Sequence, residues 1–100
     1  MKYTAVLIAL TVPLLGAPAY ASPELAAKSK CMTCHQVDKK ALGPSFKDIA
    51  AKYKGDSAAE ATLVDSMLKG AKGKWGKIPM PPQKIAPVDA QKLTKWILTL

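Results

Sequence analysis

The chain holds only two cysteines and a single histidine, and all three fall within five consecutive residues, Cys31-Met32-Thr33-Cys34-His35. A Cys-x-x-Cys-His string is the attachment signature of a c-type haem. On one helical turn, residues three apart lie on the same face, so both thiols can reach the two vinyl groups of one porphyrin. The imidazole of His35 can then serve as the proximal iron ligand. The motif predicts one haem, two thioether bonds from Cys31 and Cys34, and one axial ligand.

Other uses of a Cys-x-x-Cys pair suit this chain less well. A structural zinc site takes four protein ligands, usually Cys or His, and the chain supplies only Cys31, Cys34 and His35. A dithiol–disulfide exchanger normally lies in a βαβ thioredoxin-like unit, which neither the length nor the helical pattern of the chain allows. A purely structural disulfide would leave the adjacent histidine without a role. Covalent haem is therefore favoured.

The first 21 residues have the pattern of a signal peptide. Lys2 supplies a positive start, residues 4–15 are uncharged and mostly apolar, and Ala19-Tyr20-Ala21 has the small-x-small form of a cleavage site. The apolar run is shorter than the ~20 residues that a spanning helix needs, which disfavours an uncleaved membrane anchor. We expect cleavage after residue 21, export to the periplasm, and a mature domain over 22–100 without stable membrane insertion.

The basic side chains are all lysines, and the formal net charge of the chain is +8. Removal of residues 1–21 takes away Lys2 and no acidic residue, which leaves +7. The lack of arginine argues against bidentate recognition of phosphates or bases, and so against a nucleic-acid partner. A lysine-rich surface suits long-range attraction to an acidic protein surface, although solubility alone also accounts for it.

Helical patterns recur along the chain, and no segment has the alternation of a strand. Ser22 reads as an N-cap before Pro23, so we expect the first helix to run from about Pro23 into the cysteine pair. Apolar residues at helical spacing predict a second helix over 46–53, and Gly55 is a natural stop for it.

Two more helices are predicted in the second half of the chain. Ser57 and Glu60 form a capping-box pattern that predicts a third helix ending before Gly70. Pro87 opens a fourth helix, whose apolar face continues to the C-terminus. The expected fold is all-α, and the haem, a large apolar plate, would form the centre of a core too small to stand alone.

The segment between these two helices, residues 71–83, is rich in glycine and proline, which prevents regular structure. Because a long irregular loop in so small a domain is usually functional or disordered, the segment is a candidate site. It contains Met80 between Pro79 and Pro81, and these prolines fix backbone angles around the thioether. Alternatively, the prolines form a polyproline-type recognition segment and Met80 is incidental.

Methionine is the expected donor opposite His35, because the chain has no second histidine and a thioether is a soft ligand. Met32 lies between the haem-bonding cysteines on the proximal side. Met67 falls in an apolar helical stripe, where core packing is its expected role. Met80 is therefore predicted as the second axial ligand of the iron.

Four stretches make the chain resemble class I cytochromes c, specifically the small bacterial cytochrome c-551/c-552 group. They are residues 31–35, Gly43-Pro44, Trp75-Gly76-Lys77-Ile78-Pro79-Met80-Pro81-Pro82 and Lys95-Trp96-Ile97-Leu98. The resemblance covers essentially all of 22–100. It implies a small class I cytochrome c fold, with four or so helices wrapped round one covalently bound haem c.

The resemblance also implies roles for particular residues. The carbonyl of Pro44 would accept the Nδ1–H bond of His35, and Trp75 would direct its indole N–H to a haem propionate. Ser66 stands where some relatives have a basic residue that touches a propionate. Gln83 stands where relatives often have Asn. We expect both differences to influence the redox potential.

The function implied is that of a soluble monohaem electron carrier, not an enzyme. Acidic-surfaced redox proteins are the expected partners, and the resemblance offers nitrite reductases, terminal oxidases and a bc-type complex as candidates. A monomer is expected, because no unused apolar stripe is evident. Two alternatives remain: a haem enzyme or gas sensor with a labile Met80, and a non-redox binding module that uses the Pro-rich loop. The loop offers neither a histidine nor a carboxylate for peroxide cleavage.

Overall fold

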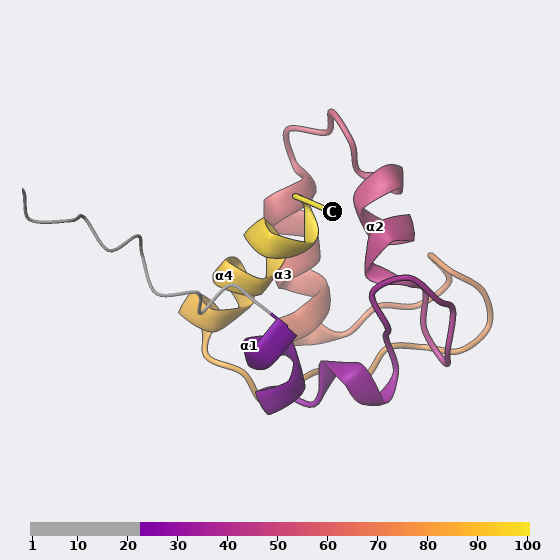
Figure 1. The fold of residues 1–100 in the computed structure, drawn as a ribbon, viewed down its shortest axis with the longest axis horizontal. Coiled ribbons are helices and arrows are strands. Elements are labelled where there is room, and N and C mark those ends of the chain that lie inside the picture. The colour runs from indigo at the N-terminus through magenta and orange to yellow at the C-terminus, as the bar shows by residue number, and fades with distance from the viewer. Residues whose placement is uncertain (1–22) are drawn as a thin grey trace, which may run out of the picture.

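The computed structural model describes residues 23–100, which form four α-helices, one 3-10 turn and their connecting loops (Figure 1). The signal peptide predicted over 1–21 and the N-cap predicted at Ser22 lie outside the described residues. Strand-like pairing within 23–100 is limited to one antiparallel bridge between Ala71 and Met80, so the all-α prediction is confirmed. In this part of the chain, no helix has the length and apolar character needed to span a membrane.

The first helix, α1, spans Pro23–Lys28, and the 3-10 turn η1 follows at Cys31–Thr33. The expected continuous helix into the cysteine pair is wrong, because Lys30 adopts the left-handed conformation with φ 64° and interrupts it. In a 3-10 turn, side chains three residues apart eclipse one another. The two cysteines therefore still leave the backbone on one side, and Cys34 N–H donates to the Cys31 carbonyl at 3.2 Å.

The second helix, α2, spans Phe46–Lys52, close to the predicted range. Ser45 is its N-cap, and its hydroxyl accepts a hydrogen bond from the Asp48 N–H at 3.0 Å. Gly55 follows the helix with φ 78°, the left-handed conformation that glycine adopts without steric cost.

The third helix, α3, spans Ala59–Lys69, but its start is capped differently from the prediction. The N-cap is Ala58, which makes no side-chain capping bond, so Ser57 does not form the predicted capping box. Instead, Asp56 Oδ1 accepts a hydrogen bond from the Ala58 N–H at 2.8 Å. The acidic side chain thus satisfies a backbone donor at the approach to the helix.

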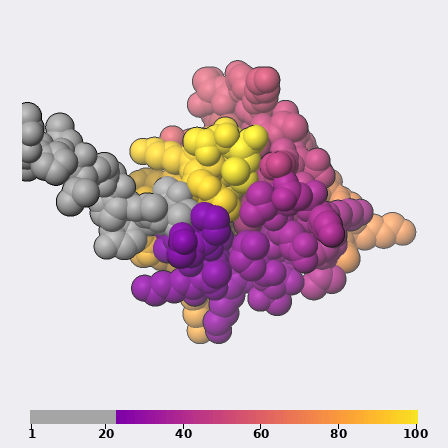
Figure 2. All heavy atoms as spheres, in the orientation of Figure 1, coloured from indigo at the N-terminus to yellow at the C-terminus, as the bar shows by residue number. Residues whose placement is uncertain are grey.

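The fourth helix, α4, spans Pro87–Ile97, with proline at its start as predicted. It contacts the other three helices. Figure 2 shows the C-terminal residues of the chain beside α1. Because α4 touches every other helix, it is the central element of the fold.

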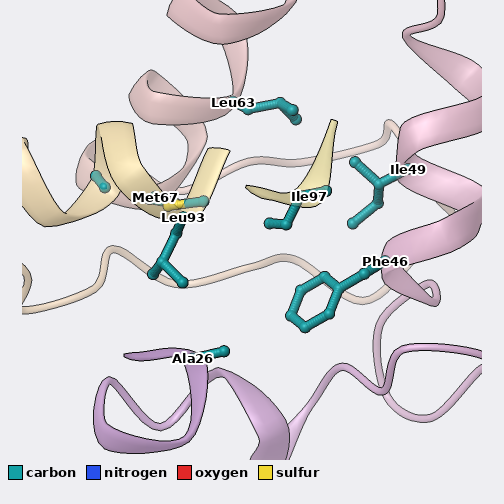
Figure 3. Packing of buried hydrophobic residues seen from close by; sticks show 8 residues of the cluster. Ala26, Phe46, Ile49, Leu63, Met67, Leu93 and Ile97 are labelled. Atoms are coloured by element: carbon teal, nitrogen blue, oxygen red, sulfur yellow. The ribbon is translucent and has the colours of Figure 1, made fainter. Parts of the chain in front are cut away.

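Side chains from all four helices converge on one hydrophobic core (Figure 3). Met67 is only 7 % exposed there, which agrees with its predicted packing role. The buried cluster consists of Ala26, Phe46, Ile49, Leu63, Met67, Ala90, Leu93 and Ile97. Most of these residues also line one cavity, and the core forms its inner wall.

Candidate haem-binding site

A cavity of about 700 Å³ opens between the 3-10 turn, α2 and the 71–83 segment. Cys31, Cys34 and His35 line it from one part of the chain, and Met80 lines it from another. Pro44 and Trp75 belong to the same lining. The fold therefore brings all six predicted site residues to one cavity.

The chemistry of this lining fits a haem. The inner wall is apolar and includes Phe46, Ile49 and Leu63, and the volume lies within the roughly 300–1,000 Å³ that is typical of cofactor sites. Two thiols, one imidazole and one thioether form a donor set suited to a covalently attached haem with His and Met ligands. Within 23–100, no group of three or more His, Cys, Asp or Glu side chains could bind a metal ion directly.

The imidazole of His35 is held in one orientation. Its Nδ1 lies 2.8 Å from the carbonyl oxygen of Pro44, the acceptor that the family resemblance named. Its ring stacks on Phe46 with centroids 5.3 Å apart, and Phe46 in turn meets Trp96 edge-on at 5.5 Å. If Nδ1–H donates to the carbonyl, Nε2 carries the lone pair that a metal ligand needs.

Gly43 lies against the same imidazole. A Cβ at this position would be 2.6 Å from His35 Cε1 and 2.9 Å from Nδ1, closer than real Cβ contacts. The Gly43 N–H donates to the Cys34 carbonyl at 2.7 Å, which ties this loop to the haem-attachment motif. Neither Gly43 nor Phe46 was a predicted site residue: Gly43 entered only through the Gly43-Pro44 stretch of the resemblance, and packing against a ligand leaves no signal in local spacing.

The two cysteine sulfurs are available for thioethers, because no disulfide joins Cys31 to Cys34. Burial raises the pKa of the Cys31 thiol. The neighbouring Cys34 adds a smaller effect in the same direction, while a backbone hydrogen bond opposes it. A raised pKa keeps this sulfur protonated and less nucleophilic at neutral pH, so it is not an activated thiol.

Met80 is half-buried, and its backbone is firmly held. Its N–H donates to the Ala71 carbonyl at 2.8 Å, and its own carbonyl accepts from the Ala71 N–H at 2.9 Å. Gly70 permits the close approach, since a Cβ there would lie 2.7 Å from the Met80 oxygen. The Gln83 N–H donates to the Met67 carbonyl at 2.7 Å. These bonds attach both sides of the Pro-rich stretch to the end of α3.

The residues expected near haem propionates lie at the edge of the cavity. Trp75 is 40 % exposed and lies in the lining, and its role toward a propionate stays a prediction. The Ser66 hydroxyl donates to the Thr62 carbonyl at 3.0 Å, and Lys74 Nζ lies 3.5 Å from the Ser66 hydroxyl oxygen. The Gln83 amide donates to the Pro81 carbonyl at 2.7 Å.

The chain is similar to known proteins over nearly its whole length. Residues 21–100 match the protein family described as Cytochrome c. Cytochrome c-551 of Pseudomonas aeruginosa is 42 % identical over 99 residues, which cover 97 % of this chain and 95 % of that protein. Cytochrome c-552 of Nitrosomonas europaea is 46 % identical over 88 residues, with coverage of 87 % and 85 %.

Solved structures show the same fold. The crystal structure of wild-type Nitrosomonas europaea cytochrome c552 superposes with a TM-score of 0.75 at 47 % identity, and covers 77 % of this chain and 96 % of that one. The class 1 cytochrome MtoD of Sideroxydans lithotrophicus superposes with a TM-score of 0.69 at 34 % identity, with coverage of 84 % and 97 %. The chain therefore belongs to the cytochrome c family, as a small class I member of the c-551/c-552 kind with one covalently bound haem c.

Proposed function

We propose that this protein is a soluble periplasmic carrier of single electrons and not an enzyme. The proposal depends on one observation above all: His35 and Met80 line the same cavity as the two cysteines. When bound, the haem supplies a one-electron ferric–ferrous couple. His35 Nε2 and Met80 Sδ would bind the iron, and a haem held by both would leave no coordination position for a substrate.

The surroundings of His35 suit a carrier. The contacts of its ring with Pro44, Gly43 and Phe46 restrict rotation, so the ligand has little room to move between oxidation states. A carbonyl acceptor at Nδ1 also makes the imidazole a stronger donor. A thioether as the second ligand favours the ferrous state, so we expect a higher potential than for a bis-histidine haem.

The lining offers little for peroxide or gas chemistry. Among the described residues that line the cavity, the carboxylate is that of Asp48. Asp48 lies in the same turn of α2 as Phe46, and the Phe46 ring stacks on His35. Residues 71–83, which include Met80, contribute neither a carboxylate nor a histidine. General acid–base catalysis needs such a group within hydrogen-bond reach of the reacting atoms.

The rim of the cavity suits a brief encounter with an acidic partner. Leu42 and Ile78 expose 60 % and 65 % of their surface there. Four exposed lysines line the same cavity: Lys30, Lys40, Lys74 and Lys77. Positive charge speeds diffusional association, and a small apolar contact releases the partner quickly. Nitrite reductases, terminal oxidases and bc-type complexes are candidate partners of this kind.

Spectroscopy of the holoprotein from a periplasmic extract tests the proposal. We expect low-spin bands and the weak far-red charge-transfer band of a Met–iron bond. We also expect the molecular mass of a mature chain that begins at Ser22. A high-spin ferric spectrum or rapid carbon monoxide binding would favour the enzyme or sensor instead. The rate of electron transfer to a partner from the same extract should fall as ionic strength rises. A rate that does not depend on salt would refute the charged docking surface.

A further inference from the structure

The most weakly supported part of the site is the Trp75 segment, residues 72–79. None of its residues makes a backbone–backbone hydrogen bond to another described residue. Gly73 and Gly76 have φ of 72° and 120°, and a Cβ at either position would meet nothing within 4 Å. Residues 72–79 are all exposed, and backbone pairing does not hold this segment, which leaves a few side-chain contacts to do so.

One contact joins Lys74 Nζ to the Ser66 hydroxyl at 3.5 Å, and a single ammonium group supplies two more. Lys52 lies in the last turn of α2, and its Nζ donates to the carbonyl of Lys74 at 3.1 Å. The same Nζ lies 4.4 Å from the centroid of the Trp75 ring and 5.9 Å from that of Tyr53. Figure 1 shows the segment, in orange, passing beside α2. Lys52 thus joins the helix to both the backbone and the aromatic side chain of the segment.

This segment leads directly to the candidate axial ligand. Its C-terminal end, Pro79, precedes Met80, and its other end follows Ala71, the pairing partner of Met80. Movement of the segment away from α2 therefore pulls on the short stretch that carries the thioether. A contact that limits such movement also limits how often Met80 leaves the cavity.

We propose that Lys52 is a positioning residue, which clamps the Trp75 segment to α2 and thereby keeps Met80 in the cavity. This inference rests on the proposed axial role of Met80. The clamp needs both properties of the side chain, because the ring contact requires a cation and the bond to the Lys74 carbonyl requires a donor. Arginine has both properties, whereas glutamine keeps only the donor.

The experiment compares the ferric holoprotein with its Lys52→Gln and Lys52→Arg variants. Lys54→Gln is the matched control, since it removes the same charge two residues away, where the lysine makes no side-chain hydrogen bond or ion pair with another residue of 23–100. Two quantities are measured: the hydrogen-exchange rates of the amides in 72–79, and the rate at which cyanide displaces the methionine from the iron. We expect both rates to rise about fivefold in Lys52→Gln, the factor for about 1 kcal/mol. Lys52→Arg and Lys54→Gln should stay within twofold of the wild type.

The outcomes distinguish the proposed role of Lys52 from the proposed electron-carrier function. If Lys52→Gln behaves like Lys54→Gln in both measurements while the wild type keeps its far-red band, the clamp is refuted and the carrier function stands. If exchange quickens over the whole domain and not over 72–79, Lys52 contributes only general stability and the proposal is also refuted. If the wild type lacks the far-red band, the axial role of Met80 fails, and with it the effect proposed for Lys52 on that ligand.

Discussion

Gly43 lies so close to the imidazole of His35 that a Cβ at position 43 would be 2.6 Å from Cε1. Its backbone does not need glycine, because its φ is not positive. The side chain is absent to make room for the ring. The backbone of Gly43 thus lies directly against the ring. Together with the Pro44 carbonyl and Phe46, it determines the orientation of His35.

We expect Gly43→Ala to lower the free energy of unfolding by about 1–3 kcal/mol, the usual cost of overpacking. The redox potential should also change, because the displaced ring weakens its bond to Pro44. Denaturant titration and voltammetry of the holoprotein measure the two effects. Gly55→Ala is the control: with φ +78° and open space around it, it should destabilise the fold while leaving the potential unchanged. Equal redox potentials in the wild type and Gly43→Ala would contradict the role of Gly43 in orienting His35.

Substitution of the methionines should separate the ligand from the core residue. Met80→Ala is expected to abolish the far-red band, to lower the potential and to let exogenous ligands bind the iron. Met67→Leu should keep the band and cost less than about 1.5 kcal/mol, since it conserves volume at a buried position. Absorption spectra and thermal unfolding of both variants provide the test. If the far-red band survived in Met80→Ala, the second ligand of the iron would have to be another residue.

Thr94 offers a stabilising substitution. The residue is fully buried in α4, and its Oγ1 has no hydrogen-bond partner among the described residues. An unsatisfied buried hydroxyl is costly, so Thr94→Val should raise the free energy of unfolding by about 1 kcal/mol. Thr94→Ser keeps the hydroxyl and loses a methyl group, and should lower it by about 1 kcal/mol. Destabilisation by Thr94→Val in denaturant titration would show that the hydroxyl is satisfied.

The start of α3 provides a test at the level of one hydrogen bond. Asp56→Ala removes the acceptor of the Ala58 N–H and should cost about 1 kcal/mol of unfolding free energy. Ser57→Ala, the neighbouring substitution, should change it by less than about 0.5 kcal/mol. Urea titration of both variants gives the comparison. The opposite order would restore the capping box that the sequence suggested.

Local patterns were enough to predict much of the fold. The ranges of α2 and α4 follow from apolar spacing and from residues such as Pro87, whose preferences act within one turn. The same patterns failed at Lys30 and Ser57. At Lys30 the chain leaves the helix through a left-handed residue, and at Ser57 the adjacent Asp56 takes the hydrogen bond instead. Short-range propensities of similar strength compete at such positions, so context determines the outcome.

The cofactor and the candidate ligands could be read from the amino-acid order, because Cys31, Cys34 and His35 are adjacent in the chain and Met80 lies in a distinctive proline-rich stretch. Most of their surroundings could not be predicted, although the resemblance did name the Pro44 carbonyl. Gly43 and Phe46 beside His35, and Lys52 beside Trp75, come together only when the loops close over the helices. Packing on a ring depends on distances across the fold, and neither composition nor periodicity records those distances.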